Sequence, residues 1–349
     1  MRVLITGNKG YIGSVITPMI AAAGHEIVGL DTGLFEHCTF GEAPPRVPQL
    51  DCDLRDVQAS DLEGFDAIVH LAALCNDPLG DLNPELTMDI NYAASVRLAR
   101  LAKEAGVPLF LYASSCSLYG ASGEDMVTEE AEFQPLTAYA KSKVLTEQEV
   151  SRLADDSFSP VFLRNATVYG LSPRLRLDLV VNHLVASACA TGVIYLKSDG
   201  TPWRPLVHVE DVGRSILAAL EAPRSLIHNQ SFNVGSNDEN YQIWQVAEIV
   251  NRIVPGSRIE YAPGATGDLR CYRVDFSKIH RTLPNFKTEW TVESGAHQLY
   301  RAFTREGFPY EDVDGPRYQR LKQIRALMSG GLLDSSLRWV NLRQAVVLS

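Results

Sequence analysis

Residues 3–13 read Val-Leu-Ile-Thr-Gly-Asn-Lys-Gly-Tyr-Ile-Gly, an apolar run that leads into three regularly spaced glycines. In a strand–turn–helix unit, Gly7 would make the tight turn, Gly10 would let a diphosphate approach the backbone, and Gly13 would let the helix pack closely on the strand. The N-terminus of that helix offers free N–H groups and a partial positive charge to an anion. A flexible loop is the alternative interpretation of the same glycines.

The residues that follow favour a dinucleotide site. A second strand-like run, residues 26–30, ends in Asp31, roughly twenty residues beyond the glycines. A carboxylate at that point accepts hydrogen bonds from a ribose diol and repels a 2′-phosphate, which favours NAD over NADP. Asp53 and Leu54 are candidates to flank the adenine, although an acidic run such as residues 51–56 is also typical of a solvated loop.

The first half of the chain alternates short apolar runs with longer helical patterns. Further strands are predicted at residues 67–71, 109–113 and 161–164, and helices at residues 11–23, 93–105 and 138–153. Continuous apolar strands separated by helices are typical of a parallel sheet that is covered on both faces. The prediction is an α/β fold, a Rossmann doubly wound parallel sheet. Pro18 lies inside the first helical pattern, where a kink or an irregular turn is expected.

After Gly170 the pattern changes to isolated strands and helices, at residues 179–191 and 241–253 among others. We therefore expect three parts. They are an NAD-binding domain over residues 1–170, which segments near 205–235 would rejoin, a smaller mixed α/β substrate domain over 171–315, and a helical tail over 316–349. The amphipathic stretch 318–328 in the tail is expected to pack on the body or on a partner subunit, and nothing in it suggests chemistry.

Composition narrows the classes of function. The chain has 349 residues, 46% of them hydrophobic, and a net charge of -10, which disfavours a nucleic-acid partner. Its longest apolar stretches are interrupted by polar residues or proline, so no membrane span is expected. No secretory signal pattern precedes the first strand, which favours a cytoplasmic protein. The 6 cysteines are scattered singly, which favours reduced thiols and no metal; a structural zinc site is the alternative.

A tyrosine and a lysine stand four residues apart at the start of the helical pattern 138–153. Tyr139 and Lys143 would share one face of the helix. An ammonium beside a phenol stabilises the phenolate and lowers its pKa, which would make Tyr139 a usable base. The serine cluster at residues 114–117 follows a predicted strand, at the sheet edge where ligands bind. A hydroxyl there would bond a substrate alcohol beside the tyrosine; a polar turn is the alternative.

Together these pieces resemble the extended short-chain dehydrogenase/reductase family, specifically its NAD-dependent nucleotide-sugar epimerases and dehydratases. The resemblance covers residues 1–310. Its motifs stand in the family's order. They are Thr6-Gly7-x-x-Gly10-x-x-Gly13, Asp31, Asp53-Leu54, His70-Leu71-Ala72-Ala73, Ser114-Ser115-x-x-x-Tyr119-Gly120, Tyr139-x-x-x-Lys143, Arg164-Asn165-Ala166-Thr167-Val168-Tyr169-Gly170 and Val207-His208-Val209-Glu210-Asp211.

The resemblance implies roles for individual residues. Tyr139 would be the catalytic acid/base, Lys143 its tuning partner and a ligand of the nicotinamide ribose, and Ser115 the catalytic hydroxyl. The cofactor would be held by Gly7, Gly10, Tyr11, Ile12, Gly13, Asp31, Asp53, Leu54, Leu71, Ala72, Ala73, Lys143 and Asn165. The substrate would be held by Cys116, Ser117, Thr167, Asn182, Arg204, Arg270 and Arg273. Guanidinium groups suit phosphate oxygens, although each arginine could equally be a surface charge.

Departures from the family's patterns narrow the reaction. The dehydratases carry Asp-Glu directly after the catalytic hydroxyl, where this chain has Cys116-Ser117, so elimination of water is disfavoured. The 3,5-epimerases have a cysteine where this chain has Ser117, so proton exchange at C3 or C5 is disfavoured, although a Cys116 thiol facing the sugar would keep it open. The resulting prediction is an NAD-dependent nucleotide-sugar epimerase acting at C4, a homodimer by the family's habit. The alternatives are a 4-ketosugar reductase or dehydrogenase and a non-catalytic NAD sensor.

Overall fold

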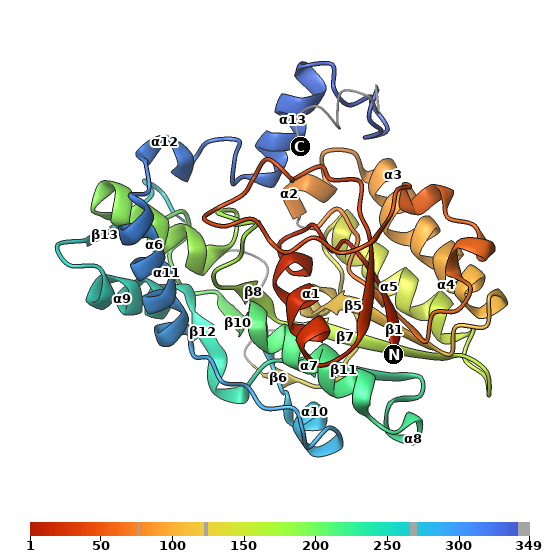
Figure 1. Ribbon diagram of the computed structural model, residues 1–349. Coiled ribbons are helices and arrows are strands. Elements are labelled where there is room, and N and C mark those ends of the chain that lie inside the picture. Colours follow the sequence, from red (N-terminus) through yellow and green to blue (C-terminus); the bar gives the residue numbers. More distant parts are fainter. Residues whose placement is uncertain (76, 122–124, 266–270, 341–349) are drawn as a thin grey trace.

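A computed structural model describes residues 1–75, 77–121, 125–265 and 271–340. Its main feature is a seven-stranded parallel sheet in the order β11-β7-β5-β4-β1-β2-β3 (Figure 1). The strands are β1 (Arg2–Thr6), β2 (Glu26–Leu30), β3 (Gln49–Leu50), β4 (Ala67–His70), β5 (Leu109–Ser115), β7 (Ser159–Asn165) and β11 (Gln230–Val234). The predicted Rossmann sheet is confirmed. The late strand β11 extends it beyond β7.

Successive side chains of β1 point to opposite faces of the sheet, and both faces are buried. Val3 and Ile5 pack in one core with helices α1 (Gly13–Ala22) and α7 (Val209–Glu221). Leu4 packs in another core with α4 (Ala94–Glu104) and α5 (Ala138–Ser151). Burial on both faces explains why the strands read as unbroken apolar runs rather than as alternating ones.

Helix α1 continues through Pro18 from Gly13–Ala22, so the irregular turn expected there is not seen. Proline removes one N–H donor, but the helix keeps its packing on the sheet through Ile16 and Ile20 and against α7. Tertiary packing of this kind outweighs a local propensity. The glycine loop therefore leads into a helix that is fixed by the core.

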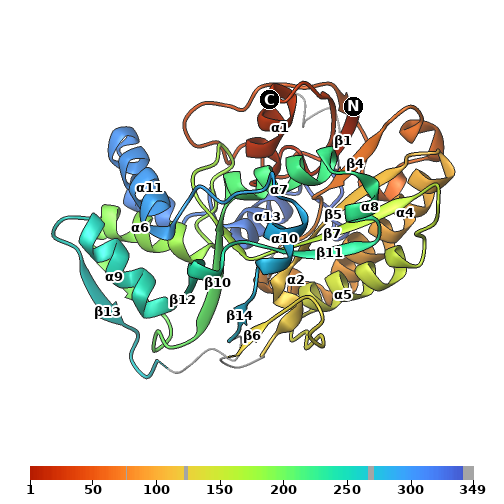
Figure 2. The ribbon, with the colours of Figure 1, turned by 90° about the horizontal axis from the view of Figure 1, so that it is seen from below.

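Most of the second half of the chain, apart from α7 and β11, forms a smaller mixed layer beside the sheet (Figures 1 and 2). Its helices α6 (Val180–Thr191), α9 (Ile243–Ile253) and α11 (Val292–Glu306) share one apolar core. Its strands form small sheets, β12-β10-β8 and the pairs β13-β9 and β14-β6. These are β6 (Met126–Val127), β8 (Thr167–Tyr169), β9 (Val193–Leu196), β10 (Trp203–His208), β12 (Asn240–Gln242), β13 (Arg258–Tyr261) and β14 (Arg273–Val274).

The remaining helices are short, apart from α13. They are α2 (Asp77–Gly80), α3 (Pro84–Thr87), α8 (Arg224–Ile227), α10 (Ser277–Thr282), α12 (Tyr310–Val313) and α13 (Arg320–Ser329), and a π-helical turn (Met88–Ala93) precedes α4. Helix α13 lies against α2 at the top of Figure 1. Its Ile324 and Leu327 form an apolar cluster with Leu74 and Leu79, so the tail packs on the body. No helix among the described residues is long and apolar enough to cross a membrane.

Candidate active site

A cavity of about 890 Å³ lies at the carboxyl ends of the main strands, between the sheet and the smaller layer. Ligands of open α/β sheets bind at this edge. The cavity brings together residues that the sequence places far apart. Of the predicted site residues, its wall contains Gly7, Gly10, Tyr11, Ile12, Gly13, Asp31, Asp53, Leu54, Leu71, Ala72, Ala73, Ser115, Ser117, Tyr139, Lys143, Asn165, Thr167 and Arg204.

The three glycines of the loop have different physical reasons to be glycine. Gly7 has a φ of +76°, which side chains rarely adopt. A Cβ on Gly13 would lie 2.1 Å from the carbonyl oxygen of Gly7, whereas a Cβ on Gly10 would meet only that oxygen, at 3.2 Å. No side chain caps the first turn of α1, which leaves its N-terminus to an anion. The loop therefore fits the diphosphate of a dinucleotide.

Asp31 lies where the ribose of that dinucleotide would be held. Its Oδ2 accepts a hydrogen bond from the backbone N–H of Lys9 at 3.1 Å, and its Oδ1 accepts one from Gly33 at 2.8 Å. Burial raises its pKa, opposed by these two bonds. Each carboxylate oxygen has a further lone pair for a ribose hydroxyl, and a 2′-phosphate would meet like charge. These residues fit NAD.

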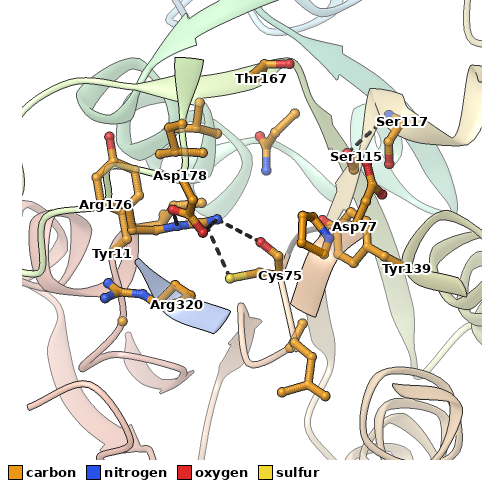
Figure 3. Close-up of a pocket in the computed structure, with 18 of the residues that line it drawn as sticks. Tyr11, Cys75, Asp77, Ser115, Ser117, Tyr139, Thr167, Arg176, Asp178 and Arg320 are labelled. Atoms are coloured by element: carbon orange, nitrogen blue, oxygen red, sulfur yellow. Dashed lines mark hydrogen bonds and ion pairs between the residues drawn. The ribbon is translucent and has the colours of Figure 1, made fainter. Parts of the chain in front are cut away.

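The catalytic candidates converge from strand β5 and helix α5. Thr137 caps α5 by accepting the N–H of Ala140 at 3.2 Å, and its hydroxyl donates to Asp77 at 2.7 Å. That cap fixes the first turn, which carries Tyr139. Ser115 ends β5, lines the same cavity as Tyr139 and is close enough to lower the pKa of the Tyr139 phenol (Figure 3). A tyrosine and a serine hydroxyl thus face the same part of the cavity.

Burial is the largest influence on the pKa of Tyr139. Burial raises the pKa of Tyr139, and the nearby Ser115 hydroxyl only partly opposes that rise. The Nζ atom of Lys143 donates to the carbonyl oxygen of Ala113 at 2.6 Å and lies 5.7 Å from the centre of the Tyr139 ring. Burial also lowers the pKa of Lys143 to about 8. The lysine is therefore held against strand β5, and desolvation is the largest influence on the pKa of the Tyr139 phenol.

Three predicted substrate ligands lie outside the cavity wall. Cys116 is fully buried, and its thiol donates to the carbonyl oxygen of Arg164 at 3.1 Å, so it does not face the sugar. The side-chain amide of Asn182 is fully buried, and it forms hydrogen bonds with Tyr11, Gly170 and Arg176. Arg273 lies over the ring of Trp203, 4.7 Å from its centre. Arg270 lies outside the described residues.

Several wall residues were not predicted from the sequence. Arg176 is buried and pairs with Asp178 at 2.8 Å, and it also donates to the carbonyl oxygen of Cys75 at 3.0 Å (Figure 3). Cys75 follows the end of β4, at the edge of the sheet where ligands bind, so its place in the cavity wall could have been predicted from the sequence. Arg320 and Leu337 come from the tail in which no chemistry was expected. No local pattern marks them, because their position depends on how the tail docks.

The cysteines form no disulfide among the described residues. All 6 cysteines are free thiols, and two of them, Cys38 and Cys116, are buried. Among the described residues, no group of three or more His, Cys, Asp and Glu side chains is placed to hold a metal ion.

The fold and the cavity define a dinucleotide-dependent enzyme of the extended short-chain dehydrogenase/reductase class. Comparison with known proteins narrows the class to one family. Residues 3–235 match the model of the NAD dependent epimerase/dehydratase family. The chain belongs to that family. The predictions of family, fold and NAD as cofactor are confirmed.

Individual relatives cover nearly the whole chain. A UDP-glucose 4-epimerase of Mycolicibacterium smegmatis is 29% identical over 297 residues, which are 81% of this chain and 92% of the relative. A UDP-glucose 4-epimerase of Corynebacterium glutamicum is 25% identical over 340 residues, 93% of this chain and 99% of the relative. Among solved structures, MoeE5 in complex with UDP-glucose and NAD superposes with a TM-score of 0.75 at 25% identity, over 88% of this chain and 99% of that chain.

Proposed function

We propose that this chain is an NAD-dependent nucleotide-sugar epimerase that inverts C4 through a transient 4-keto sugar. The observation that carries the proposal is the meeting of Tyr139 and Ser115 in the cavity that also contains the glycine loop. A hydroxyl pair beside a dinucleotide suits the oxidation of an alcohol. The relatives named UDP-glucose 4-epimerases support the same reaction.

Tyr139 would move the proton of the C4 hydroxyl. Its phenolate would take that proton as the C4 hydrogen leaves as hydride. When hydride returns to the opposite face of C4, the Tyr139 phenol would give a proton back to the 4-keto oxygen. Ser115 would orient the hydroxyl by a second hydrogen bond. Acid/base work of this kind supplies about 10²–10⁴-fold in rate. Bound NAD supplies the hydride acceptor and donor, and its positively charged ring favours the ionised phenol.

The side chains after Ser115 disfavour the neighbouring reactions of the family. Elimination of water and proton exchange at C3 or C5 both need a further acid or base near the sugar. Cys116 is turned into the core, where burial raises its pKa, and Ser117 is an uncharged hydroxyl. Asp77 lies in the wall, but its Oδ1 already accepts the hydroxyl of Thr137. A redox inversion at C4 needs none of these groups as an acid or base.

The other half of the cavity would hold the nucleotide and the sugar. Thr167 at the start of β8 and Arg204 in β10 line the cavity from the smaller layer. Asn165 lines it from the end of β7, and Ser117 from the turn that follows β5. Ser117 Oγ and Asn165 Oδ1 are buried atoms without a hydrogen-bond partner among the described residues. Buried polar atoms normally have partners, so Ser117 is a candidate to bind a substrate hydroxyl and Asn165 a candidate to bind the cofactor.

A panel of UDP-, GDP-, CDP- and dTDP-sugars followed by proton NMR tests this function. Inversion at C4 without net change in absorbance at 340 nm is the expected result. Net formation or consumption of reduced nicotinamide would show a 4-ketosugar reductase or dehydrogenase instead. A 4-keto-6-deoxy product would show a dehydratase. No conversion of any sugar, with NAD bound, would favour a sensor.

Two further proposals concern the protein in solution. We infer a homodimer that forms through α4 and α5, as the family resemblance implies, and Leu145 on α5 is 36% exposed. Light scattering at micromolar concentration tests it, and a monomer would contradict it. We also infer a cytoplasmic location, because six free thiols suit a reducing compartment. Fractionation of the source cells tests that location.

A further inference from the structure

The C-terminal arm, residues 318–340, contacts the part of the cavity wall expected to hold adenosine. The indole N–H of Trp339 donates to the carbonyl oxygen of Thr32 at 2.7 Å, directly after Asp31. A second contact lies on the other side, where Arg55 Nη1 donates to the carbonyl oxygen of Ser336 at 2.9 Å. The arm therefore bridges the end of β2 and the residues that follow Asp53.

Leu337 lies between those two contacts. It has a φ of +58°, a backbone conformation that is costly for a branched side chain. Its side chain is 4% exposed and forms part of the cavity wall. The Arg338 guanidinium beside it pairs with Asp56, with one bond of 2.9 Å. These contacts hold the leucine against the cavity.

Arg320, at the start of α13, is the second wall residue of the arm. It is 1% exposed, its Nη2 donates to the carbonyl oxygen of Arg174 at 2.8 Å, and its guanidinium lies 4.2 Å from the centre of the Phe35 ring. Its Nη1 is buried and has no hydrogen-bond partner among the described residues. Figure 3 shows it on the same side of the cavity as Tyr11 of the glycine loop.

No described carboxylate forms an ion pair with this buried guanidinium. Asp178 is near enough to stabilise its charge, but Asp178 forms its ion pair with the neighbouring Arg176. Cys38 is close to Arg320, but burial raises the pKa of its thiol, so it stays neutral. A buried charge without a partner is strongly unfavourable, and a buried guanidinium with a free N–H in a ligand cavity is suited to an anion. Guanidinium groups bind phosphate oxygens particularly well.

We propose that the C-terminal arm is part of the NAD site, in which Arg320 donates from Nη1 to the diphosphate of NAD and Leu337 covers the adenosine. The substrate diphosphate is the competing anion. NAD is favoured because the arm's other contacts reach Thr32, Arg55 and Asp56, around the adenosine, and because Phe35 follows Asp31. The inference rests on NAD as cofactor and holds whichever sugar is the substrate.

The test compares Arg320→Met with Arg325→Met, which removes an exposed arginine from the same helix. Protein stripped of NAD is titrated with ADP-ribose, with adenosine and with UDP by calorimetry or NMR. Arg320→Met should raise the dissociation constant of ADP-ribose about 10- to 100-fold, because a hydrogen bond from a charged group is lost. The dissociation constant of adenosine should stay unchanged. Arg325→Met should leave all three unchanged.

Thermal unfolding separates this role from a structural one. Loss of an unneutralised buried charge should leave the Tm of the NAD-free protein unchanged or raise it, and should shrink the increase that NAD causes. Weakened UDP binding with ADP-ribose unaffected would assign Arg320 to the substrate and overturn the proposal. If Arg320→Met weakened the binding of adenosine and of ADP-ribose equally, or lowered the Tm of the NAD-free protein, the proposal would also be overturned. Leu337→Gly relieves the backbone and should weaken adenosine and ADP-ribose equally.

Discussion

The Nζ atom of Lys143 lies 2.6 Å from the carbonyl oxygen of Ala113, so helix α5 is tied to strand β5 by a buried lysine. Ala113 stands two residues before Ser115 in β5, and Lys143 stands one helical turn after Tyr139. The bond therefore fixes the distance between the two groups proposed for catalysis. Its cost is the burial of an ammonium, which lowers the lysine's pKa to about 8.

That cost predicts how stability depends on pH. Between pH 8 and about 10.4, Lys143 keeps its proton in the unfolded protein and loses it in the folded protein. The contribution of Lys143 to the free energy of unfolding therefore rises with pH in this range. Below pH 8 the full penalty, about 3 kcal/mol, is present. Urea unfolding of NAD-free protein should therefore show the wild type gaining stability relative to Lys143→Met from pH 7.5 to 10. The exposed neighbour variant Lys141→Met should follow the wild type, and parallel pH profiles for Lys143→Met would contradict the assignment.

The glycine loop predicts two different outcomes for two similar substitutions. Gly13→Ala places a Cβ 2.1 Å from the oxygen of Gly7 and should lower the Tm of the NAD-free protein by several degrees. Gly10→Ala meets only one oxygen, at 3.2 Å, and should leave that Tm nearly unchanged while it blocks the diphosphate. Thermal scans and the NAD content of the purified variants check this contrast. A Gly10→Ala protein that retains full NAD would show that the diphosphate lies elsewhere.

Asp31 predicts the choice between the two dinucleotides. Asp31→Asn keeps an acceptor for the N–H of Gly33 but removes the negative charge. NADP binding should strengthen by about tenfold or more, because the 2′-phosphate no longer meets a like charge. NAD binding should weaken as a ribose acceptor is lost. Titration of stripped protein with both dinucleotides measures the ratio, and an unchanged ratio would remove Asp31 from the ribose site.

Tyr139→Phe tests the acid/base directly. The variant keeps the ring and loses the hydroxyl, so kcat should fall by about 10²–10⁴-fold while bound NAD and the Tm of the loaded protein stay close to those of the wild type. Tyr261→Phe, at a tyrosine that is 50% exposed, is the control and should retain full activity. Wild-type turnover by Tyr139→Phe would mean that another group moves the proton.

The sequence was sufficient for the features that local patterns encode. Gly7, Gly10 and Gly13 predicted the loop, and Asp31 lines the same cavity, because both depend on a strand–turn–helix unit that the chain builds locally. The parallel sheet followed from the unbroken apolar strands. Most predicted site residues also line one cavity, since they stand at the ends of strands that meet at one edge.

Features that depend on distant packing were not predicted. Cys116 turns into the core because Arg164 on the adjacent strand β7 offers its carbonyl oxygen, which no spacing reveals. The raised pKa of Tyr139 depends on how completely the surrounding layers bury it. Arg320 and Leu337 enter the cavity only because the tail docks on α2 and on the residues after β2 and β3. An amphipathic pattern shows that a tail packs, and it does not show where.

The proposed inversion requires hydride to leave C4 and return to C4 within one site. The nucleotide sugar that the panel identifies is prepared with deuterium at C4 and incubated with the enzyme in ordinary water, and the inverted product is examined by NMR and mass spectrometry. The expected result is that deuterium remains at C4 and that no solvent hydrogen appears at C3 or C5. Loss of the C4 deuterium to solvent, or solvent hydrogen at a neighbouring carbon, would contradict it.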